Sequence, residues 1–286
     1  MSTVAVLGTG LLGSGFAQNL LQRGETVVVW NRTASKTEAL VALGATAAAS
    51  PSKAVASADR VHLVLTADSA VDAVIEAALP GLKPGTYLID HSTNRPDAVA
   101  ERYERLRAAG VNYVPAPVFM SPANARDASG LMLLSATADE AATLMPILET
   151  MTGRVWHVGE RADQAATLKL CGNGALIGFA GVIGDLYAVA QARGLEPSAV
   201  LELFEQFPVG NFVPYIGKRI LASDNMDASF ELTMARKDVR LMVETGGEPN
   251  MSALPGVGRS MDAAIEQGRG QQDYGSFAWP GRPSRS

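Results

Sequence analysis

Residues 4–13 read VAVLGTGLLG, and this pattern predicts the fold of the first half of the chain. Its apolar start is typical of a short buried strand. Glycines follow at positions 8, 10 and 13 with the spacing G-x-G-x-x-G, and a helical pattern begins at Leu12. In this context the turn is predicted to bind a dinucleotide, because its backbone can approach a pyrophosphate and the helix N-terminus points unpaired N–H groups at it. The alternative is a glycine-rich turn without a ligand. The predicted phosphate-binding turn comprises Gly8, Thr9, Gly10, Leu11, Leu12 and Gly13.

Strand-like and helix-like runs alternate through the rest of the first half. After the first strand, the predicted strands lie at residues 26–30, 60–66, 87–90, 113–118 and 131–135. The predicted helices lie at residues 12–23, 36–42, 69–79, 96–109 and 139–150. Such alternation is typical of parallel strands joined by right-handed crossover helices. We therefore expect an α/β domain with a Rossmann-type doubly wound sheet over residues 1–160.

After His157 the pattern changes to helices without strand-like alternation. One long helix is expected at residues 162–193, followed by helices at 197–207, 213–221, 231–245 and 257–267. These patterns predict an interdomain helix at 161–193, an all-α domain at 194–275 and a loose tail at 276–286, since residues 268–286 are rich in Gly, Pro, Ser and Arg. The apolar part of the long helix, residues 168–186, contains Lys169, Asn173 and Asp185. These polar residues favour a buried core helix over a membrane span.

The composition excludes several classes of protein. The 286 residues are 47% hydrophobic and 19% charged, which excludes global disorder. A formal net charge of −5 gives no sign of a nucleic-acid partner. Cys171 is the only cysteine, which excludes an internal disulfide and a cysteine-cluster zinc site, and the three histidines lack metal-ligand spacing. No basic segment precedes the first strand, so we expect a cytoplasmic protein without a signal peptide, a metal or a membrane partner.

The end of the second predicted strand indicates which dinucleotide binds. NAD-binding domains usually carry Asp or Glu there, whereas this chain has no acidic residue between Trp30 and Glu38. Arg32 can bind a 2′-phosphate with two hydrogen bonds, Asn31 and Thr33 add donors, and Lys36 adds positive charge. This pattern favours NADPH over NADH, and the alternative is that Arg32 is a solvated surface charge. The remaining predicted cofactor contacts at the end of the strand 60–66 are Leu65 and Thr66.

Lys169 and Asn173 are four residues apart on the long helix, so they share one face among apolar neighbours. A lysine removed from water has a lowered pKa and can exchange protons near neutrality. Beside a nicotinamide it could protonate a carbonyl oxygen while hydride reaches the carbon, and Asn173 could orient the same oxygen. The alternative is a lysine that extends its ammonium group to solvent.

The order of these motifs resembles the β-hydroxyacid dehydrogenases, relatives of 6-phosphogluconate dehydrogenase, and the resemblance covers nearly the whole chain. The matching segments after the glycine-rich turn are residues 90–93 (DHST), 116–118 (APV) and 169–173 (KLCGN), Phe230 with 237–238 (KD), and 268–270 (GRG) with Asp273. Residues 31–33 resemble the NADPH-preferring branch of the family. The resemblance implies a Rossmann-type domain, a long interdomain helix, an all-α second domain, and a homodimer or homotetramer formed through the helical domain.

The resemblance also assigns roles to individual residues. Lys169 matches the catalytic lysine of the family, and Asn173 matches its substrate-orienting asparagine. Ser92 and Thr93 match the pair that lines substrate and cofactor, with Thr93 counted in both sites. The C-terminal matches are Lys237 on the cofactor side, and Phe230 and Asp238 on the substrate side.

The chain departs from the family after Ala116-Pro117-Val118. The family usually continues with Ser-Gly-Gly, whose backbone N–H groups bind a substrate carboxylate, but this chain continues with FMSP at residues 119–122. Proline has no N–H, and bulky side chains hinder such an anion-binding loop. We therefore expect an apolar wall against the substrate, formed by Phe119 and Met120. The predicted substrate contacts in this loop are Val118, Phe119, Met120 and Ser121.

Three functions are compatible with the sequence. The first is an NADPH-dependent oxidoreductase that interconverts a small aldehyde or ketone and its alcohol. The second is an imine reductase, a related group that shares the fold and the Trp-Asn-Arg-Thr signature but usually lacks the lysine. The third is a non-catalytic NADPH-binding module, which the presence of Lys169 and Asn173 disfavours.

Overall fold

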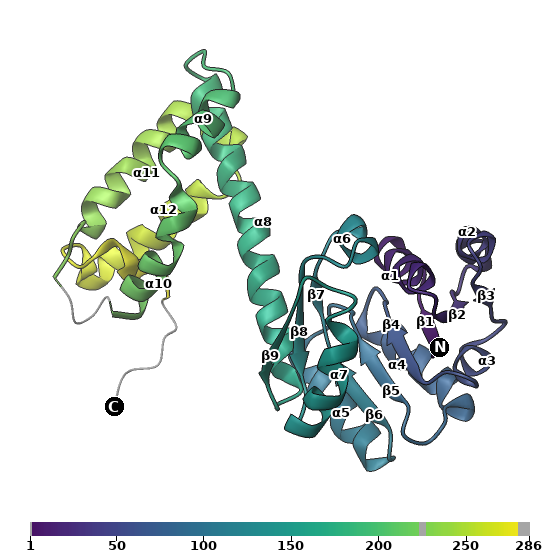
Figure 1. Cartoon of the computed structure of the whole chain (residues 1–286). Coiled ribbons are helices and arrows are strands. Elements are labelled where there is room, and N and C mark those ends of the chain that lie inside the picture. Colours follow the sequence, from purple (N-terminus) through teal and green to yellow (C-terminus); the bar gives the residue numbers. More distant parts are fainter. Residues whose placement is uncertain (1, 223–226, 280–286) are drawn as a thin grey trace. The chain divides into compact units, whose positions relative to one another are not determined.

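The computed structural model describes residues 2–222 and 227–279 and forms two units, Met1–Asn173 and Gly174–Ser286 (Figure 1). The boundary between the units falls within the long helix α8 (Asp163–Gln191). The predicted range of this helix, residues 162–193, differs from the observed range by one residue at its start and two at its end.

Six parallel strands form the main sheet of the first unit, in the order β3-β2-β1-β4-β5-β6. They are β1 (Thr3–Leu7), β2 (Thr26–Trp30), β3 (Thr46–Ala47), β4 (Arg60–Leu63), β5 (Tyr87–Asp90) and β6 (Asn112–Pro115). The strand order reverses between β1 and β4, and ligands of doubly wound sheets bind beyond the carboxyl ends of the strands at such a point. The predicted Rossmann-type sheet is confirmed.

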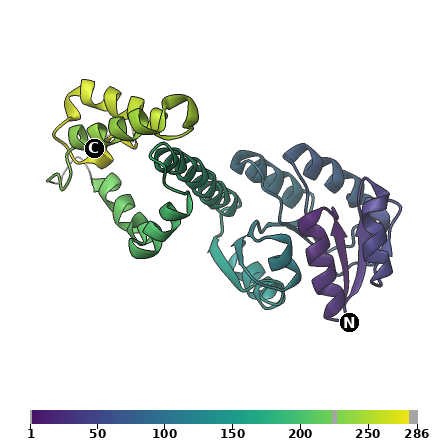
Figure 2. The ribbon, with the colours of Figure 1, turned by 90° about the horizontal axis from the view of Figure 1, so that it is seen from above.

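Helices cover both faces of this sheet (Figure 2). One core cluster contains Val4 and Val6 with side chains of α1, α6 and α7, and the other contains Ala5 and Leu7 with side chains of α3, α4 and α5. The alternation along β1 arises because successive strand residues point to opposite faces. The helices of this unit before α8 are α1 (Leu11–Gln22), α2 (Glu38–Ala42), α3 (Pro51–Val55), α4 (Asp68–Ala78), α5 (Pro96–Ala108), α6 (Pro122–Arg126) and α7 (Ala138–Leu148).

A second, three-stranded sheet corrects one predicted strand. The expected strand at 113–118 is divided, since β6 ends at Pro115 and β7 (Val118–Phe119) pairs antiparallel with β8 (Leu131–Ser135). Pro117 lies at the division, where its missing N–H prevents a continuous ladder. β8 also pairs with β9 (Arg154–Gly159), which was not predicted. Of the other strands and α-helices of this unit, the short segments β3, α3 and α6 were not predicted.

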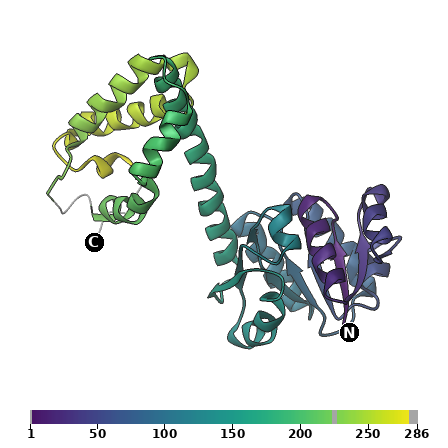
Figure 3. The same ribbon diagram turned by 45° about the horizontal axis from the view of Figure 1, so that its top comes forward.

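The described elements of the second unit after α8 are helical, apart from one isolated bridge between Glu231 and Asp273. Helices α11 and α12 run side by side (Figure 3) around a core that includes Leu232, Val239 and Met261. The carboxylate of Asp185 on α8 accepts hydrogen bonds from three successive backbone N–H groups at residues 252–254, where α12 begins. The α-helices are α9 (Ser198–Gln206), α10 (Val213–Ala222), α11 (Leu232–Gly246) and α12 (Leu254–Ala264).

The start of the expected loose tail is ordered. Tyr274–Phe277 form a short 3₁₀ helix, and Ser276 is buried. The cause is Asp273, a fully buried carboxylate that is paired with Arg219 and accepts hydrogen bonds from the backbone N–H groups of Ser229 and Gly275. The prediction of a tail at 276–286 is therefore wrong for its first residues, and residues 280–286 lie outside the described part.

The long helix α8 is not the buried core helix that was expected. By length and composition it could cross a membrane, and 11% of its most apolar 18-residue window is buried. Leu176, Ile177 and Phe179 are exposed on it. The apolar residues of this helix are therefore largely uncovered in a single chain.

Candidate active site

The glycine-rich turn after β1 has a backbone that requires glycine at two positions. Gly8 has φ +101°, and a Cβ there would lie 2.2 Å from the Val64 carbonyl oxygen. A Cβ on Gly13 would lie 1.9 Å from the Gly8 carbonyl oxygen, so α1 packs directly on the turn. Gly10 precedes α1, and a Cβ there would meet no atom within 4 Å. The space above Gly10 is therefore open for a ligand at the helix N-terminus.

A cavity of about 430 Å³ lies at the point where the strand order reverses. Its lining comes from Trp30 at the end of β2, from segments that follow β1, β2 and β4, and from Pro51 of α3 and apolar residues of α4. The structure thus brings together most of the predicted cofactor residues. Those that line this cavity are Gly8, Gly10, Asn31, Arg32, Thr33, Lys36, Leu65 and Thr66.

The other residues of the predicted turn have different places. Thr9 and Leu11 line a neighbouring cavity of about 450 Å³ with Lys36 and Arg126. Leu12 packs against a core cluster and Gly13 is buried, so both support the turn rather than line either cavity.

Asn31 ties the glycine-rich turn to the loop after β2. Its Oδ1 accepts a hydrogen bond from the Thr9 backbone N–H at 3.1 Å, and its Nδ2 donates to the Thr33 carbonyl at 2.9 Å. One N–H of the Asn31 amide remains for a ligand. Arg32 is exposed and makes no hydrogen bond or ion pair with the described residues.

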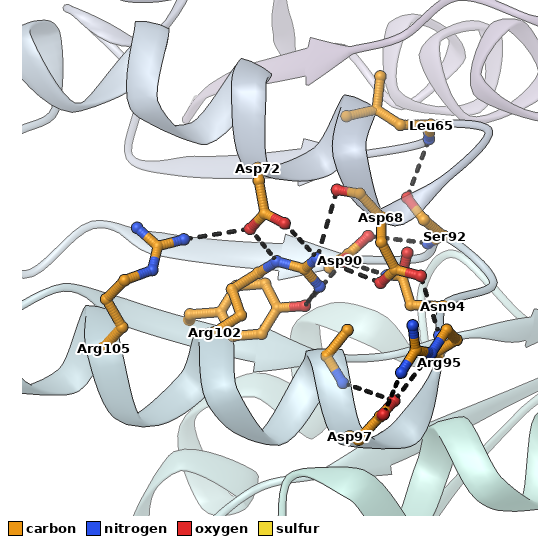
Figure 4. A network of polar contacts seen from close by, with 12 residues as sticks. Leu65, Asp68, Asp72, Asp90, Ser92, Asn94, Arg95, Asp97, Arg102 and Arg105 are labelled. Atoms are coloured by element: carbon orange, nitrogen blue, oxygen red, sulfur yellow. Dashed lines mark hydrogen bonds and ion pairs between the residues drawn. The ribbon is translucent and has the colours of Figure 1, made fainter.

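A buried polar network holds the loop after β5 (Figure 4). The Asp90 carboxylate accepts hydrogen bonds from the Tyr113 hydroxyl at 2.7 Å, from Asn94 Nδ2 at 2.8 Å and from the Ser92 backbone N–H at 2.9 Å. Burial raises the pKa of Asp90, and the hydrogen bonds from Ser92 and Tyr113 oppose that shift. The Ser92 hydroxyl accepts from the Leu65 N–H at 2.9 Å, so the network reaches the cofactor cavity. Ser92 is buried, whereas Thr93 is exposed at the same loop.

Arg102 on α5 extends this network through the Tyr113 hydroxyl to two aspartates of α4. Its side chain is 1% exposed, and its guanidinium donates to Asp72 at 2.7 Å, to Asp68 at 3.2 Å and to the Tyr113 hydroxyl at 3.3 Å. Burial and the Asp90 carboxylate raise the pKa of Tyr113 well above its ordinary value. Tyr113 therefore stays a neutral phenol, and its hydroxyl donates a hydrogen bond to Asp90.

Two buried histidines, which the sequence did not link, hold the segment that leads to β7. His91 Nδ1 lies 2.7 Å from the Ala116 carbonyl, and His62 Nδ1 lies 2.9 Å from His91 Nε2. Because a carbonyl only accepts, His91 carries its proton on Nδ1 and accepts a hydrogen bond from His62. Burial lowers the pKa of both rings, that of His91 to about 4, so both are neutral at pH 7.

The structure brings Lys169 and Asn173 together as the helical spacing predicted. Lys169 is 8% exposed, and its Nζ donates to Asn173 Oδ1 at 2.9 Å. Burial lowers the pKa of Lys169. A contact that was not predicted is that of Lys169 Nζ with Phe119, whose ring centroid is 4.1 Å away.

The loop at residues 118–121 does not act as a single wall. Val118 is 3% exposed and belongs to a core cluster, against which Met120 also packs. Ser121 caps helix α6, since its Oγ accepts from the Asn124 N–H at 3.1 Å and Asn124 Oδ1 accepts from the Ser121 N–H at 2.9 Å. Of these loop residues, Phe119 contacts Lys169. The Ser-Pro-x-Asn pattern at 121–124 is a helix-start signal that could have predicted α6.

The three predicted C-terminal site residues lie in the second unit. Lys237 and Asp238 form an ion pair at 3.1 Å in the middle of α11, and both are partly exposed. Phe230 stacks at a tilt on Tyr274, with ring centroids 5.9 Å apart. Their part in the site stays a prediction. Among residues 2–222 and 227–279, no group of three or more His, Cys, Asp or Glu residues could hold a metal ion.

Residues 3–159, more than half of the chain, match the family model for the NAD binding domain of 6-phosphogluconate dehydrogenase. The chain belongs to the β-hydroxyacid dehydrogenase family. This confirms the resemblance drawn from the sequence motifs. As a β-hydroxyacid dehydrogenase family member, the protein is an NAD(P)-dependent oxidoreductase.

Individual relatives of this family member span its whole length. The chain is 29% identical to the uncharacterized oxidoreductase YfjR of Bacillus subtilis, over 96% of this chain and 98% of that one. It is 26% identical to the NAD-dependent L-serine dehydrogenase of Pseudomonas aeruginosa, over 96% of each chain. The solved structure of the Streptomyces aurantiacus imine reductase is similar with a TM-score of 0.88 at 25% identity, over 98% of this chain and 100% of that one.

Proposed function

We propose that the protein is an NADPH-dependent reductase that interconverts a small aldehyde or ketone and its alcohol, with Lys169 as the general acid and base. The observation that carries this proposal is the buried ammonium of Lys169, which donates to Asn173 and has no carboxylate partner among the described residues. An ammonium that is not neutralised by a carboxylate keeps a proton available for a substrate oxygen.

The residues around the cavity fit a dinucleotide. The open space above Gly10 and the N-terminus of α1 suit a pyrophosphate, while Arg32 and Lys36 suit a 2′-phosphate. When bound, NADPH supplies a hydride to the carbonyl carbon. Lys169 then donates a proton to the oxygen, Asn173 orients that oxygen, and the exposed Thr93 contacts the substrate. In the reverse direction the neutral Lys169 amine accepts the proton of the alcohol.

We expect Arg32→Ala to weaken NADPH binding about 10–150-fold and to leave NADH binding nearly unchanged. This range corresponds to the roughly 1.5–3 kcal/mol of a hydrogen bond to a charged group. Only NADPH carries the 2′-phosphate that Arg32 would bind. The measurement is the dissociation constant of each cofactor by fluorescence titration, with Arg23→Ala as a control at a distant surface site. Equal affinity of the unmodified protein for NADPH and NADH would contradict this role of Arg32.

We expect butanal to be reduced with a kcat/KM at least equal to that of succinic semialdehyde, which has the same carbon chain and a terminal carboxylate. Phe119 occupies the loop where relatives bind a carboxylate, and a carboxylate loses hydration there without gaining enough donors. Arg95, a candidate cation for such a substrate, is already paired with Asp97. A strong preference for the acid would show that another group, such as Lys237, anchors the anion.

Imine reduction is the second candidate function, and the similarity to the Streptomyces aurantiacus imine reductase favours it. The experiment compares NADPH oxidation with a ketone alone, with the ketone plus a primary amine, and with a preformed cyclic imine. Turnover of the ketone alone supports the carbonyl reductase. Turnover that requires the amine or the imine supports the alternative and makes Lys169 a binding group.

We also propose that the chain forms a homodimer or homotetramer through its helical unit. The exposed side chains of Leu176, Ile177 and Phe179 on α8 support this, because uncovered apolar surface of this kind is typical of an interface. Light scattering on the purified protein gives the mass in solution and tests the assembly.

A further inference from the structure

The Phe119 ring lies between two features of helix α8. Its centroid is 4.1 Å from Lys169 Nζ, which is within the range of a cation–π contact. A Cβ built on Gly172 would lie 2.3 Å from Phe119 Cζ and 2.6 Å from Cε1. The ring therefore rests on the bare backbone of Gly172 with the ammonium over its face.

The strand β7 gives Phe119 this direction. Phe119 pairs with Leu131 of β8, and its neighbour Val118 pairs with Met132 and packs into a core cluster. Because successive strand residues point to opposite faces, Phe119 points away from that core. The strand pairing, and not the flexibility of a loop, thus sets the position of the ring.

We infer that Phe119 is a positioning residue that holds the Lys169 ammonium on its ring face, and that Gly172 is the residue that admits the ring. This inference rests on the proposed role of Lys169 as the proton donor. The segment that replaces Ser-Gly-Gly would then position Lys169 in addition to excluding carboxylates. The inference also explains why residue 172 is a glycine, which the helix alone does not require.

The contact has a direct consequence for the proton of Lys169. Burial disfavours the ammonium and lowers the pKa of Lys169. The negative face of an aromatic ring favours the ammonium and offsets part of this effect. The groups that face Nζ in the described structure are the Phe119 ring and Asn173 Oδ1, and no described carboxylate pairs with it. Since an ammonium has three N–H donors, two remain after the bond to Asn173.

The test is the pKa of Lys169 measured by NMR on protein labelled with ¹³C-lysine. The chain has six lysines, so the Lys169 signal can be assigned by its absence in Lys169→Arg. We expect Phe119→Leu to lower this pKa by about 0.4–1.5 pH units, because leucine keeps the site apolar but has no ring face. Phe119→Tyr keeps a ring and should give a pKa near that of the unmodified protein.

A second variant displaces the ring without removing it. Gly172→Ala forces the Phe119 ring off α8 and should lower the pKa of Lys169 in the same direction. The matched control is Gly174→Ala on the same helix, where a Cβ meets no atom within 4 Å, and it should leave the pKa unchanged. Reduction needs the ammonium, so kcat/KM for an aldehyde should fall as the pH rises through the Lys169 pKa. In Phe119→Leu and Gly172→Ala this fall should begin at a lower pH than in the unmodified enzyme.

The inference and the proposed function fail in different ways. An unchanged Lys169 pKa in both Phe119→Leu and Gly172→Ala would overturn the inference, whether or not aldehydes are reduced. If the Lys169 pKa falls in both variants but the protein reduces no carbonyl, the inference about Phe119 stands and the proposed reaction is refuted.

Discussion

Lys169→Ala should lower the rate of carbonyl reduction by about 10²–10⁴-fold, the range for the loss of a general acid, and leave NADPH binding nearly unchanged. The side chain lies 2.9 Å from Asn173 and touches Phe119, and it is not among the residues that line the cofactor cavity. Single-turnover reduction of an aldehyde with bound NADPH measures the chemical step, and fluorescence titration measures cofactor affinity.

Lys169→Arg is the matched variant, because it keeps the positive charge but holds its proton at every accessible pH. A general acid predicts that this variant is also slow, whereas a purely electrostatic role predicts recovery. Burial lowers the pKa of Lys169, and reduction needs the protonated form. The rate of the unmodified enzyme should therefore fall as the pH rises through this lowered pKa. Undiminished kcat in Lys169→Ala would refute the assignment.

Arg102→Ala should lower the free energy of unfolding of the first unit by about 2–4 kcal/mol. The loss of one partner from a buried ion pair costs about 3–5 kcal/mol, and the partly exposed carboxylates of Asp68 and Asp72 reduce that cost. The variant also removes the hydrogen bond from Arg102 to the Tyr113 hydroxyl, which itself donates to Asp90. Urea unfolding in a Trp279→Phe background is a suitable measurement, since Trp30 and Trp156 then report on the first unit.

Arg105→Ala provides the matched control on the same helix. Arg105 also pairs with Asp72 and Glu76, but its side chain is 47% exposed, so its loss should cost less than about 1 kcal/mol. The hydrogen bond from Arg102 lowers the pKa of Asp72, and the stability from this pair is present above the ordinary pKa of aspartate. The difference in the free energy of unfolding between Arg102→Ala and the unmodified protein should therefore shrink as the pH falls through the Asp72 pKa. Equal costs for the two arginines would contradict the structural role of Arg102.

Local spacing in the sequence was enough to predict the sheet, the glycine-rich turn and the pair on α8. Gly8 and Gly13 are five residues apart, and Lys169 and Asn173 are four apart, so the geometry of one turn or one helix face determines each relation. The wrong predictions concern features that local spacing does not determine. The prediction joined β6 and β7 across Pro117 and treated residues 276–286 as a loose tail, because partners distant in the chain determine both features.

The residues that hold the site in place make contacts between strands and helices that are far apart in the sequence. His62 and His91 are 29 residues apart, and Tyr113 and Asp90 are 23 apart, yet the sheet order places β4, β5 and β6 side by side. Phe119 reaches Lys169 because β7 pairs with β8 in a particular register and Gly172 lacks a side chain. A sequence pattern carries the direction of a side chain within its own strand or helix. Strand order, register and the packing of helices then determine which distant side chain it meets, and these arise from burial of the whole core.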